Sequence, residues 1–284
     1  MYVEKNSTAE RRDLIAKNAS PLDDIEYLKV YYQQHGNFPM FTQVLLETRT
    51  DCNRSCKFCP QSHFVRPLKV MEWEVFTKVI NELSAIDFGG RIAFYMTNEP
   101  LLETRLLDMI KYARSKSARF FLDITSNGKN LSSKQVDEFF IAGLDNININ
   151  DYRNDREKFP NKISQYLESI ASDFKSNPKV TYIKRSTKEI LSNYAGTILG
   201  AKRKLQSSFC NYPFRKLSIS ADGNVILCCN DYTYKTNFGN VMEKSLKEIW
   251  FTDEINQYRS NLLNELRSGI CEDCDEFQNY SVFT

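Results

Sequence analysis

The feature that most restricts the fold is a repeated alternation between short apolar runs and longer amphipathic segments. Residues 43–48 are predicted to form a buried strand, and apolar residues between Trp73 and Ile86 then recur at the spacing of one helix face. The same order returns in the strand and helix pairs 91–96 and 103–115, 119–124 and 132–142, 146–150 and 163–174, and in a last strand at 180–184. Such alternation predicts a parallel sheet with its helices outside.

Five to six strand–helix units are too few to close an eight-fold barrel. We therefore predict an α/β fold whose main part is a partial (β/α)6 barrel over residues 41–205, with the functional site at the C-terminal ends of the strands. Residues 1–40 contain a helical stretch at 22–34 and are predicted to form an N-terminal helical cap.

The pattern changes in the last part of the chain, residues 206–284. Strands at 217–220 and 225–229 surround the turn residues 221–224, which predicts a β-hairpin. Two short helices are expected after Ser245. We predict a separate small module with a hairpin and helices.

Charge and cysteine content restrict the class of protein. The 38 Lys and Arg residues against 36 Asp and Glu give a net charge of +2, which provides no reason to expect nucleic acid or an anionic membrane as partner. No run approaches the roughly 18 apolar residues of a membrane span, and charges interrupt the start of the chain where a signal peptide is apolar. We expect a cytoplasmic protein. Its eight cysteines then favour metal or redox chemistry over disulfides, and two histidines are too few for a His-rich metal centre.

Three cysteines follow the first predicted strand directly. Cys52, Cys56 and Cys59 are separated by three and then two residues, at a position where barrels carry functional groups. Three thiolates on one loop can hold three irons of a cubane cluster and leave the fourth iron without a protein ligand. A small molecule with an amine and a carboxylate can chelate that iron and accept an electron. The alternatives are a zinc site completed by His63 and buried unreactive thiols.

The other five cysteines are Cys210, Cys228, Cys229, Cys271 and Cys274. Four of them can ligate one closed cluster, or alternatively a structural zinc ion. Cys228 and Cys229 are neighbours on a predicted strand, so their side chains should point to opposite faces and only one can readily reach the metal.

The first cysteine motif, with the aromatic Phe58 before its last cysteine, resembles the signature of the radical S-adenosylmethionine (SAM) superfamily. The resemblance covers most of residues 43–284. It implies that these three cysteines hold a [4Fe–4S] cluster, and that bound SAM is cleaved reductively to methionine and a 5′-deoxyadenosyl radical. That radical takes a hydrogen atom from a strong C–H bond.

Other segments indicate where SAM binds. Residues 97–100, Thr-Asn-Glu-Pro, are similar to the superfamily's Gly-Gly-Glu-Pro segment but lack its glycines, and 125–128 is similar to a polar turn of the SAM pocket. Polar residues on the fourth strand and at the end of the fifth add candidates. The predicted cofactor-binding residues are Phe58, Asn98, Glu99, Ser126, Asn127, Asn148, Asn150 and Arg185. A purely structural role is the alternative for these residues. Glu99 can lie at a helix N-terminus, and 125–128 can be only a turn. Asn148 and Asn150 can be satisfied structural amides, and Arg185 can be an exposed charge at the end of a strand.

The C-terminal cysteines are similar to the auxiliary-cluster pattern of the SPASM and twitch modules. Gly223 lies four residues before Cys228, as in that pattern. The resemblance implies one auxiliary [4Fe–4S] cluster, the shorter twitch arrangement, held by Cys210, Cys228, Cys271 and Cys274. Cys229 is then a spare thiol, either packed in the core or acting as a hydrogen-atom donor.

Segments 52–56, 99–102 and 191–196 resemble the radical dehydrogenases of aminocyclitol biosynthesis, which carry an arginine where this chain has Tyr194. The resemblance implies an oxidoreductase that oxidises an alcohol carbon of a small cyclitol, sugar or aminoglycoside-like substrate. The auxiliary cluster would accept an electron from the substrate, and a flavodoxin- or ferredoxin-type protein would donate electrons to the first cluster. The alternatives are a radical epimerase with Cys229 as catalytic hydrogen donor, a peptide-modifying radical SAM enzyme, and a non-catalytic zinc-binding protein.

Overall fold

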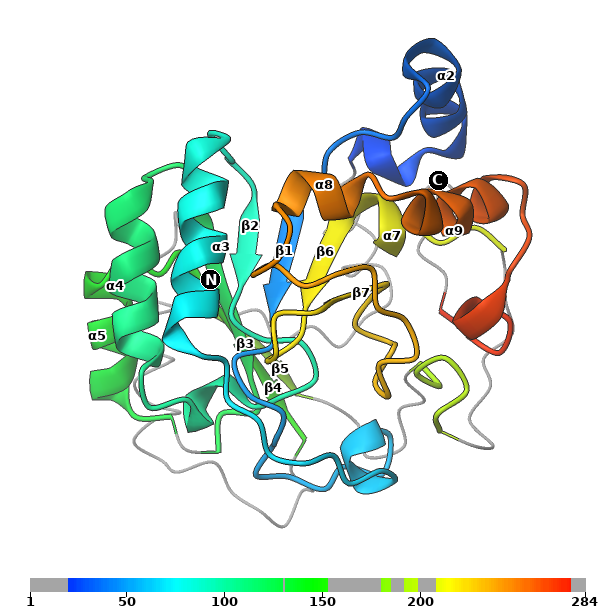
Figure 1. The fold of residues 1–284 in the computed structure, drawn as a ribbon. Coiled ribbons are helices and arrows are strands. Elements are labelled where there is room, and N and C mark those ends of the chain that lie inside the picture. The colour runs from blue at the N-terminus through cyan, green and yellow to red at the C-terminus, as the bar shows by residue number, and fades with distance from the viewer. Residues whose placement is uncertain (1–19, 130, 153–179, 185–191, 199–207, 277–284) are drawn as a thin grey trace.

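The computed structural model describes residues 20–129, 131–152, 180–184, 192–198 and 208–276. Its centre is a seven-stranded sheet with the order β5-β4-β3-β2-β1-β6-β7 (Figure 1). The strands are β1 Gln43–Leu46, β2 Arg91–Ala93, β3 Phe121–Ser126, β4 Asn146–Asp151, β5 Val180–Lys184, β6 Lys216–Ile219 and β7 Val225–Ile226. Neighbouring strands from β5 to β6 pair in parallel, and only the β6–β7 pair is antiparallel. The predicted parallel sheet is confirmed.

The helices of the described residues fall into three groups. The barrel region contains α3 Trp73–Ala85, α4 Leu106–Lys116 and α5 Ser133–Ile141, with the short 3-10 turns η2 Pro60–Ser62 and η3 Pro100–Leu102. The C-terminal region contains α7 Tyr212–Arg215, α8 Leu246–Trp250, α9 Asp253–Leu263 and η4 Gly269–Cys271. The N-terminal region contains η1 Pro21–Asp23 and α2 Ile25–His35.

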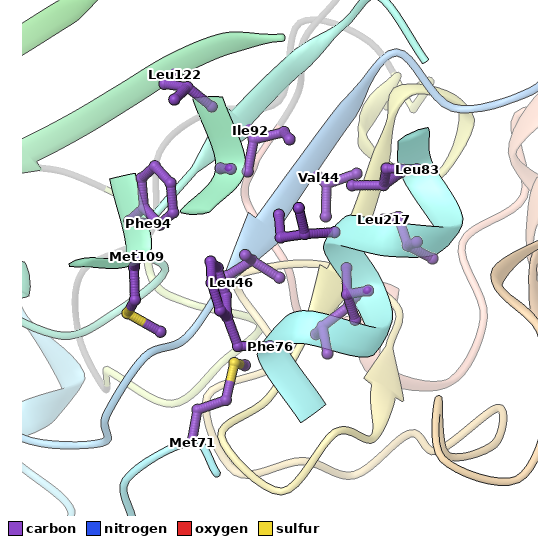
Figure 2. Close-up of a cluster of buried hydrophobic side chains, with 14 of the residues drawn as sticks. Val44, Leu46, Met71, Phe76, Leu83, Ile92, Phe94, Met109, Leu122 and Leu217 are labelled. Carbon is purple, nitrogen blue, oxygen red and sulfur yellow. The ribbon is translucent and has the colours of Figure 1, made fainter. Parts of the chain in front are cut away.

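Helices α3, α4 and α5 lie along one side of the sheet (Figure 1). Strand side chains alternate between the two faces, so every second residue of β1, β2 and β3 meets these helices. Val44, Leu46 and Ile92 are fully buried there against Phe76 of α3 (Figure 2). The opposite face of the sheet is therefore the one that is free to carry polar residues.

The C-terminal region continues the barrel sheet. Strand β6 pairs with β1 from Gln43↔Lys216 to Leu46↔Ile219. Leu217 of β6 belongs to the same buried cluster as the barrel strands (Figure 2). The boundary predicted between residues 205 and 206 stays a prediction, because 199–207 lie outside the described residues.

The predicted hairpin is confirmed, but its second strand is shorter than expected. Gly223, with φ of +82°, forms the turn, and its N–H donates to the Ser220 carbonyl over 2.9 Å. The strand ends at Ile226 because the Leu227 N–H donates to Oγ1 of Thr236 (2.9 Å) and leaves the ladder. The prediction that Cys228 and Cys229 lie on a strand was therefore wrong: both lie in the loop that follows it.

Two other elements begin or end at residues that differ from the predicted ones, in each case beside a local hydrogen bond. Strand β2 ends before residue 96, where the Met96 N–H donates to Oδ1 of Asn98 over 2.9 Å. Helix α4 starts at Leu106 and not at Glu103, whose carboxylate accepts the Arg105 N–H over 2.9 Å. The helix predicted at 163–174 lies outside the described residues.

The predicted N-terminal helix is confirmed as α2. Asp24 caps it by accepting the Glu26 and Tyr27 N–H groups. The N-terminal region packs on the C-terminal region through an apolar cluster. Its members are Leu22, Leu28, Phe38, Phe209, Cys210, Phe214, Leu262 and Leu263. Within the described part of the chain, we find no helix with the length and apolar character that crossing a membrane requires.

Candidate active site

The three cysteines of the first motif line a cavity of about 220 Å³ at the C-terminal ends of the barrel strands. The predicted residues Phe58, Asn98, Glu99, Ser126, Asn127 and Asn150 also line it. Thr97 and Thr125 of the two predicted SAM segments line it too, as do Arg54 and Tyr194 of the segments that resemble radical dehydrogenases. No sequence pattern pointed to the remaining lining residues, Tyr95, Met96 and Tyr152. A second hollow of about 480 Å³ lies between α4 and α5, and no cysteine lines it.

The cysteine loop is folded into a compact turn. The Cys59 N–H donates to the Cys56 carbonyl over 2.9 Å, and the Ser62 hydroxyl donates to the same oxygen over 2.8 Å. All three thiols are half-buried. Burial is the main reason that the pKa of each thiol is raised, and together with the neighbouring Cys52 and Cys56 it brings the pKa of Cys59 to about 12.

This donor set fits an iron–sulfur cluster. Metal-bound sulfur is thiolate, so thiols that resist ionisation beside one another need a cationic partner to become thiolates together. Cluster iron would supply that charge at Cys52, Cys56 and Cys59. Among the residues that the structure describes, no three His, Cys, Asp or Glu side chains converge closely enough to hold a single metal ion. The thiols are neighbours, not a formed coordination sphere.

Glu99 joins the loops that follow β2 and β3. Its carboxylate is 2% exposed and accepts the Ser126 hydroxyl (2.7 Å) and the Asn127 N–H (2.8 Å). It also accepts the Leu101 N–H at the start of η3, so the alternative role at a helix N-terminus is present as well. Burial is the main reason that the pKa of Glu99 lies above its usual value. Asn127 in turn donates from Nδ2 to Sγ of Cys52 over 3.7 Å, which brings the predicted SAM segments to the first cysteine.

Thr97 and Asn98, which replace the superfamily's glycines, are tied to the end of β1. The Thr97 hydroxyl donates to Oε1 of Glu47 (2.9 Å), and Nδ2 of Asn98 donates to Oγ1 of Thr48 (3.2 Å). Their side chains therefore hold this segment by hydrogen bonds to the two residues that directly follow β1.

The sheet face opposite the helices is polar below the cavity. Asp123 is 1% exposed and accepts Nε of Arg91 (3.0 Å) and Nδ2 of Asn148 (3.0 Å). Asn148 thus takes the satisfied structural role and does not line the cavity, whereas Asn150 does. Arg185 lies outside the described residues.

The four predicted auxiliary ligands form a second thiol group. Cys210, Cys228, Cys271 and Cys274 are each between 7% and 9% exposed. The pKa values of Cys210, Cys228 and Cys271 are raised, mainly by burial and also by the other thiols of the group, and that of Cys271 reaches about 12. Sγ of Cys274 accepts the Glu276 N–H (3.4 Å) and Nδ2 of Asn230 (3.8 Å). Buried thiols with N–H donors directed at sulfur fit a second cluster.

Tyr194 is another residue that lines the cavity. Burial raises the pKa of its hydroxyl, and the thiols of Cys59 and Cys229 raise that pKa as well. Tyr194 and Ala195 have φ of 48° and 52°, a region that non-glycine residues rarely adopt. The buried Asp275 fixes this turn by accepting the Asn193 N–H over 2.8 Å. The sequence offered no periodicity that could place such a turn.

Cys229, the predicted spare thiol, is half-buried. Burial raises its pKa, and the nearby Lys216 ammonium opposes that effect. Lys216 had not been singled out from the sequence. It lies at the start of β6, with its Nζ 3.1 Å from the ring centre of Tyr212.

Comparisons with known proteins match both regions. The Radical SAM superfamily profile matches residues 46–151, and the SPASM profile, an iron–sulfur cluster-binding domain, matches residues 210–275. The chain is 26% identical over 247 residues to S-adenosyl-L-methionine-dependent 2-deoxy-scyllo-inosamine dehydrogenase of Niallia circulans, covering 86% of this chain and 96% of that protein. It is 28% identical over 106 residues to the tungsten-containing aldehyde ferredoxin oxidoreductase cofactor-modifying protein of Pyrococcus furiosus, covering 35% and 28% of the two chains.

Among solved structures, the crystal structure of BtrN in complex with AdoMet and 2-DOIA matches with a TM-score of 0.75 and 25% identity. The match covers 84% of this chain and 94% of BtrN. The partial barrel predicted from the sequence is thus the fold of a SAM-binding relative. The chain therefore carries a radical SAM domain followed by a SPASM-type iron–sulfur domain, and it is an enzyme that uses SAM and a [4Fe–4S] cluster.

Proposed function

We propose that this enzyme oxidises a hydroxyl-bearing carbon of a small cyclitol, sugar or aminoglycoside-like molecule by two electrons. The observation that carries the proposal is the cavity, which is bounded by the first three cysteines and by Tyr194. The thiols of Cys59 and Cys229 both act electrostatically on the buried Tyr194 hydroxyl, which supports a substrate position within reach of the first cluster and of Cys229. The relative that matches over most of its length is named a dehydrogenase of 2-deoxy-scyllo-inosamine.

The proposal assigns Cys52, Cys56 and Cys59 to the SAM-binding cluster, and Cys210, Cys228, Cys271 and Cys274 to the auxiliary cluster. When bound, SAM and the first cluster supply the radical that removes a hydrogen atom from the substrate carbon. A cluster held by the other four cysteines would supply an acceptor for one electron from the substrate, and the oxidation would also need a base for the hydroxyl proton.

The chain's own residues position SAM and exclude water. Glu99 orients Ser126 and the Asn127 backbone at the cavity wall. Phe58 packs on Tyr152 with ring centres 4.9 Å apart, and both rings line the cavity. We assign SAM contacts to these residues and to Asn98 and Asn150, and leave Asn148 in its bond to Asp123.

The polar face of the sheet supports a hydroxylated substrate. Tyr95 lines the cavity and its hydroxyl accepts a hydrogen bond from Arg91, which also binds the buried Asp123. These groups already satisfy one another, so they present a rigid polar floor and not an unpaired charge. Such a floor suits the hydroxyl and amine groups of a small ring bound beside SAM.

The test is anaerobic turnover of the reconstituted enzyme with SAM and a panel of aminocyclitols that begins with 2-deoxy-scyllo-inosamine. We expect a ketone and 5′-deoxyadenosine in equal amounts. Substrate deuterated at the oxidised carbon should pass one deuterium into 5′-deoxyadenosine. Formation of 5′-deoxyadenosine with no oxidised product from any panel member would contradict the proposal.

A radical epimerase is the second candidate, because Cys229 is half-buried, lies outside the four-thiol group and is close to Tyr194. Turnover of Cys229→Ala in deuterated water separates the two reactions. Epimerisation needs this thiol and places solvent deuterium on carbon, whereas oxidation continues without it.

We also propose a cytoplasmic location and a flavodoxin- or ferredoxin-type electron donor. All eight cysteines are free thiols in the structure, which favours a reducing compartment. Fractionation of the cells that make the protein tests the location.

A further inference from the structure

The N-terminal region makes a buried polar contact with the C-terminal region through Asp23. Asp23 is the last residue of η1 and is 4% exposed. Its carboxylate accepts Nη1 of Arg215 over 2.6 Å and 2.8 Å, and it also accepts Nδ2 of Asn211. A carboxylate is seldom buried unless it is paired, so this contact fixes the two regions against each other.

The Asp23 carboxylate is also fixed by its own segment. Its Oδ2 atom accepts the Ser20 N–H over 2.8 Å, and the Asp23 N–H donates to the Ser20 carbonyl over 2.8 Å. In return, the Ser20 hydroxyl accepts the Leu22 N–H over 3.3 Å. The carboxylate therefore has little freedom to turn, and it can hold the groups that bind it in one place.

Both partners of Asp23 lie at the ends of the short helix α7. Asn211 is the residue before the helix, and Arg215 is its last residue. The Asn211 side chain makes no capping hydrogen bond to α7, because its amide group is directed to Asp23. Within the part of the chain that the structure describes, Oδ1 of Asn211 and Nε of Arg215 have no hydrogen-bond partner. Loss of the Asp23 charge would therefore leave a buried guanidinium unpaired and loosen both ends of α7.

Cys210 comes directly before Asn211, and the N-terminal region forms part of its surroundings. Cys210 is 9% exposed and lies in the apolar cluster to which the N-terminal region contributes Leu22 and Leu28. The thiols of Cys271 and Cys274 belong instead to the main apolar cluster of the molecule. Cys210 is thus held by a different set of apolar residues from those around the other two thiols.

The middle of α7 has a separate anchor. Nε of Arg259, on α9, donates to the Pro213 carbonyl over 2.9 Å. A variant of Asp23 should therefore leave α7 attached to α9, while it frees the turn that carries Cys210 and Asn211. A cluster needs four sulfurs that converge, and the contacts behind each ligand fix its direction. The effect of Asp23 is thus expected at one ligand of the second thiol group.

We propose that Asp23 is a positioning residue for the auxiliary cluster, because it fixes the direction of the Cys210 thiol through Asn211 and Arg215. Residues 20–38 are then part of the site that holds this cluster, and not only a cap on the C-terminal region. Asp23 acts through its two partners and is not itself a ligand. The inference rests on the proposed function for the assignment of Cys210 to the auxiliary cluster.

The test compares iron and sulfide per chain in the anaerobically reconstituted full-length enzyme. Asp23→Asn keeps the size of the side chain and removes the charge that pairs with Arg215. We expect iron to fall from about eight atoms per chain to about five, while 5′-deoxyadenosine formation from SAM stays within about twofold of the wild type. Glu103→Gln is the matched control, since Glu103 is 5% exposed, pairs with Arg105 over 2.8 Å and should keep its full iron.

A double variant shows whether Asp23 acts through Cys210. Cys210→Ala alone should lose about four irons, and Asp23→Asn added to it should remove no more. A further loss of iron in the double variant would mean that Asp23 supports the whole fold, and it would overturn the proposal.

Asn211→Ala tests the same link with the ion pair of Asp23 and Arg215 intact, and it should also lose iron. Full iron in Asn211→Ala, and in Asp23→Asn where it folds, would overturn the positioning role if Cys210→Ala still loses iron. Full iron in Cys210→Ala would instead contradict the cluster assignment on which the proposed function depends.

Discussion

The two thiol groups differ in how the chain encloses them. Cys52, Cys56 and Cys59 lie on one short loop, are half-buried and face a cavity. The second group is assembled from residues 210, 228, 271 and 274, and none of its thiols is more than 9% exposed. An exposed iron can bind and activate a small molecule, whereas a fully enclosed cluster can only exchange electrons. The difference in enclosure matches the division of labour that we propose.

The two regions are joined by a buried polar contact. Glu47, at the end of β1, is fully buried and accepts hydrogen bonds from Arg66 of the barrel and from the Tyr234 hydroxyl of the C-terminal region. The barrel and the C-terminal region thus share a buried carboxylate in addition to the β1–β6 pairing. The following variants test how independent they are.

The largest effect is expected from substitutions in the half-buried thiol group. Cys52→Ala, Cys56→Ala or Cys59→Ala should abolish SAM cleavage and lower iron from about eight to about four atoms per chain. Iron and sulfide analysis and 5′-deoxyadenosine formation measure this. Cys229→Ala should keep its full iron. Persistent SAM cleavage, or stoichiometric zinc in place of iron, would refute the assignment.

Substitutions in the second, buried thiol group should have a different effect. Cys271→Ala or Cys274→Ala should also remove about four irons, yet retain SAM cleavage while product formation is lost. Both residues belong to the main apolar cluster, and cluster binding is coupled to folding. The melting temperature should therefore fall further than in Cys56→Ala. Equal melting temperatures for the two kinds of variant would mean that enclosure does not distinguish the groups.

The contact between the regions should contribute substantially to stability. Glu47→Gln leaves the Arg66 guanidinium without its carboxylate in a buried place, which should lower the free energy of unfolding by about 3 kcal/mol. Urea unfolding of the metal-free protein measures it. Glu26→Gln is the control, since Glu26 is 73% exposed in a surface ion pair with Lys29 and should contribute less than about 1 kcal/mol. A similar loss of unfolding free energy in Glu47→Gln and Glu26→Gln would contradict the buried character of the contact between Glu47 and Arg66.

The smallest effect concerns the pH dependence of stability that arises from Glu99, at the wall of the first cavity. Burial raises the pKa of Glu99 above 4.5, so the folded protein holds this proton more tightly than the unfolded chain. Its contribution to stability is fully present below pH 4.5 and is lost as the pH rises through the higher folded pKa. Glu99→Gln should flatten that part of the unfolding profile, while Ser133→Ala should not. An unchanged profile in Glu99→Gln would contradict the cause given for the shift.

Local signals in the sequence predicted much of this molecule. The apolar spacing of 73–86 predicted α3, the alternation of strands and helices predicted the parallel sheet, and the spacing of Cys52, Cys56 and Cys59 predicted a three-thiol loop. Each of these signals depends on residues that are close in the chain. Where a distant residue intervened, the prediction failed: the strand at 225–229 is cut short by Thr236.

The sequence by itself determined the order of elements, the two sets of cysteines and the polar segments after the strands, because helix and strand periodicity and ligand spacing are properties of short stretches of chain. Only the tertiary structure decided that β6 continues the sheet beside β1 and that Tyr194 enters the cavity on a left-handed turn. These arrangements arise when surfaces far apart in the chain bury one another. No local pattern records which surfaces will meet.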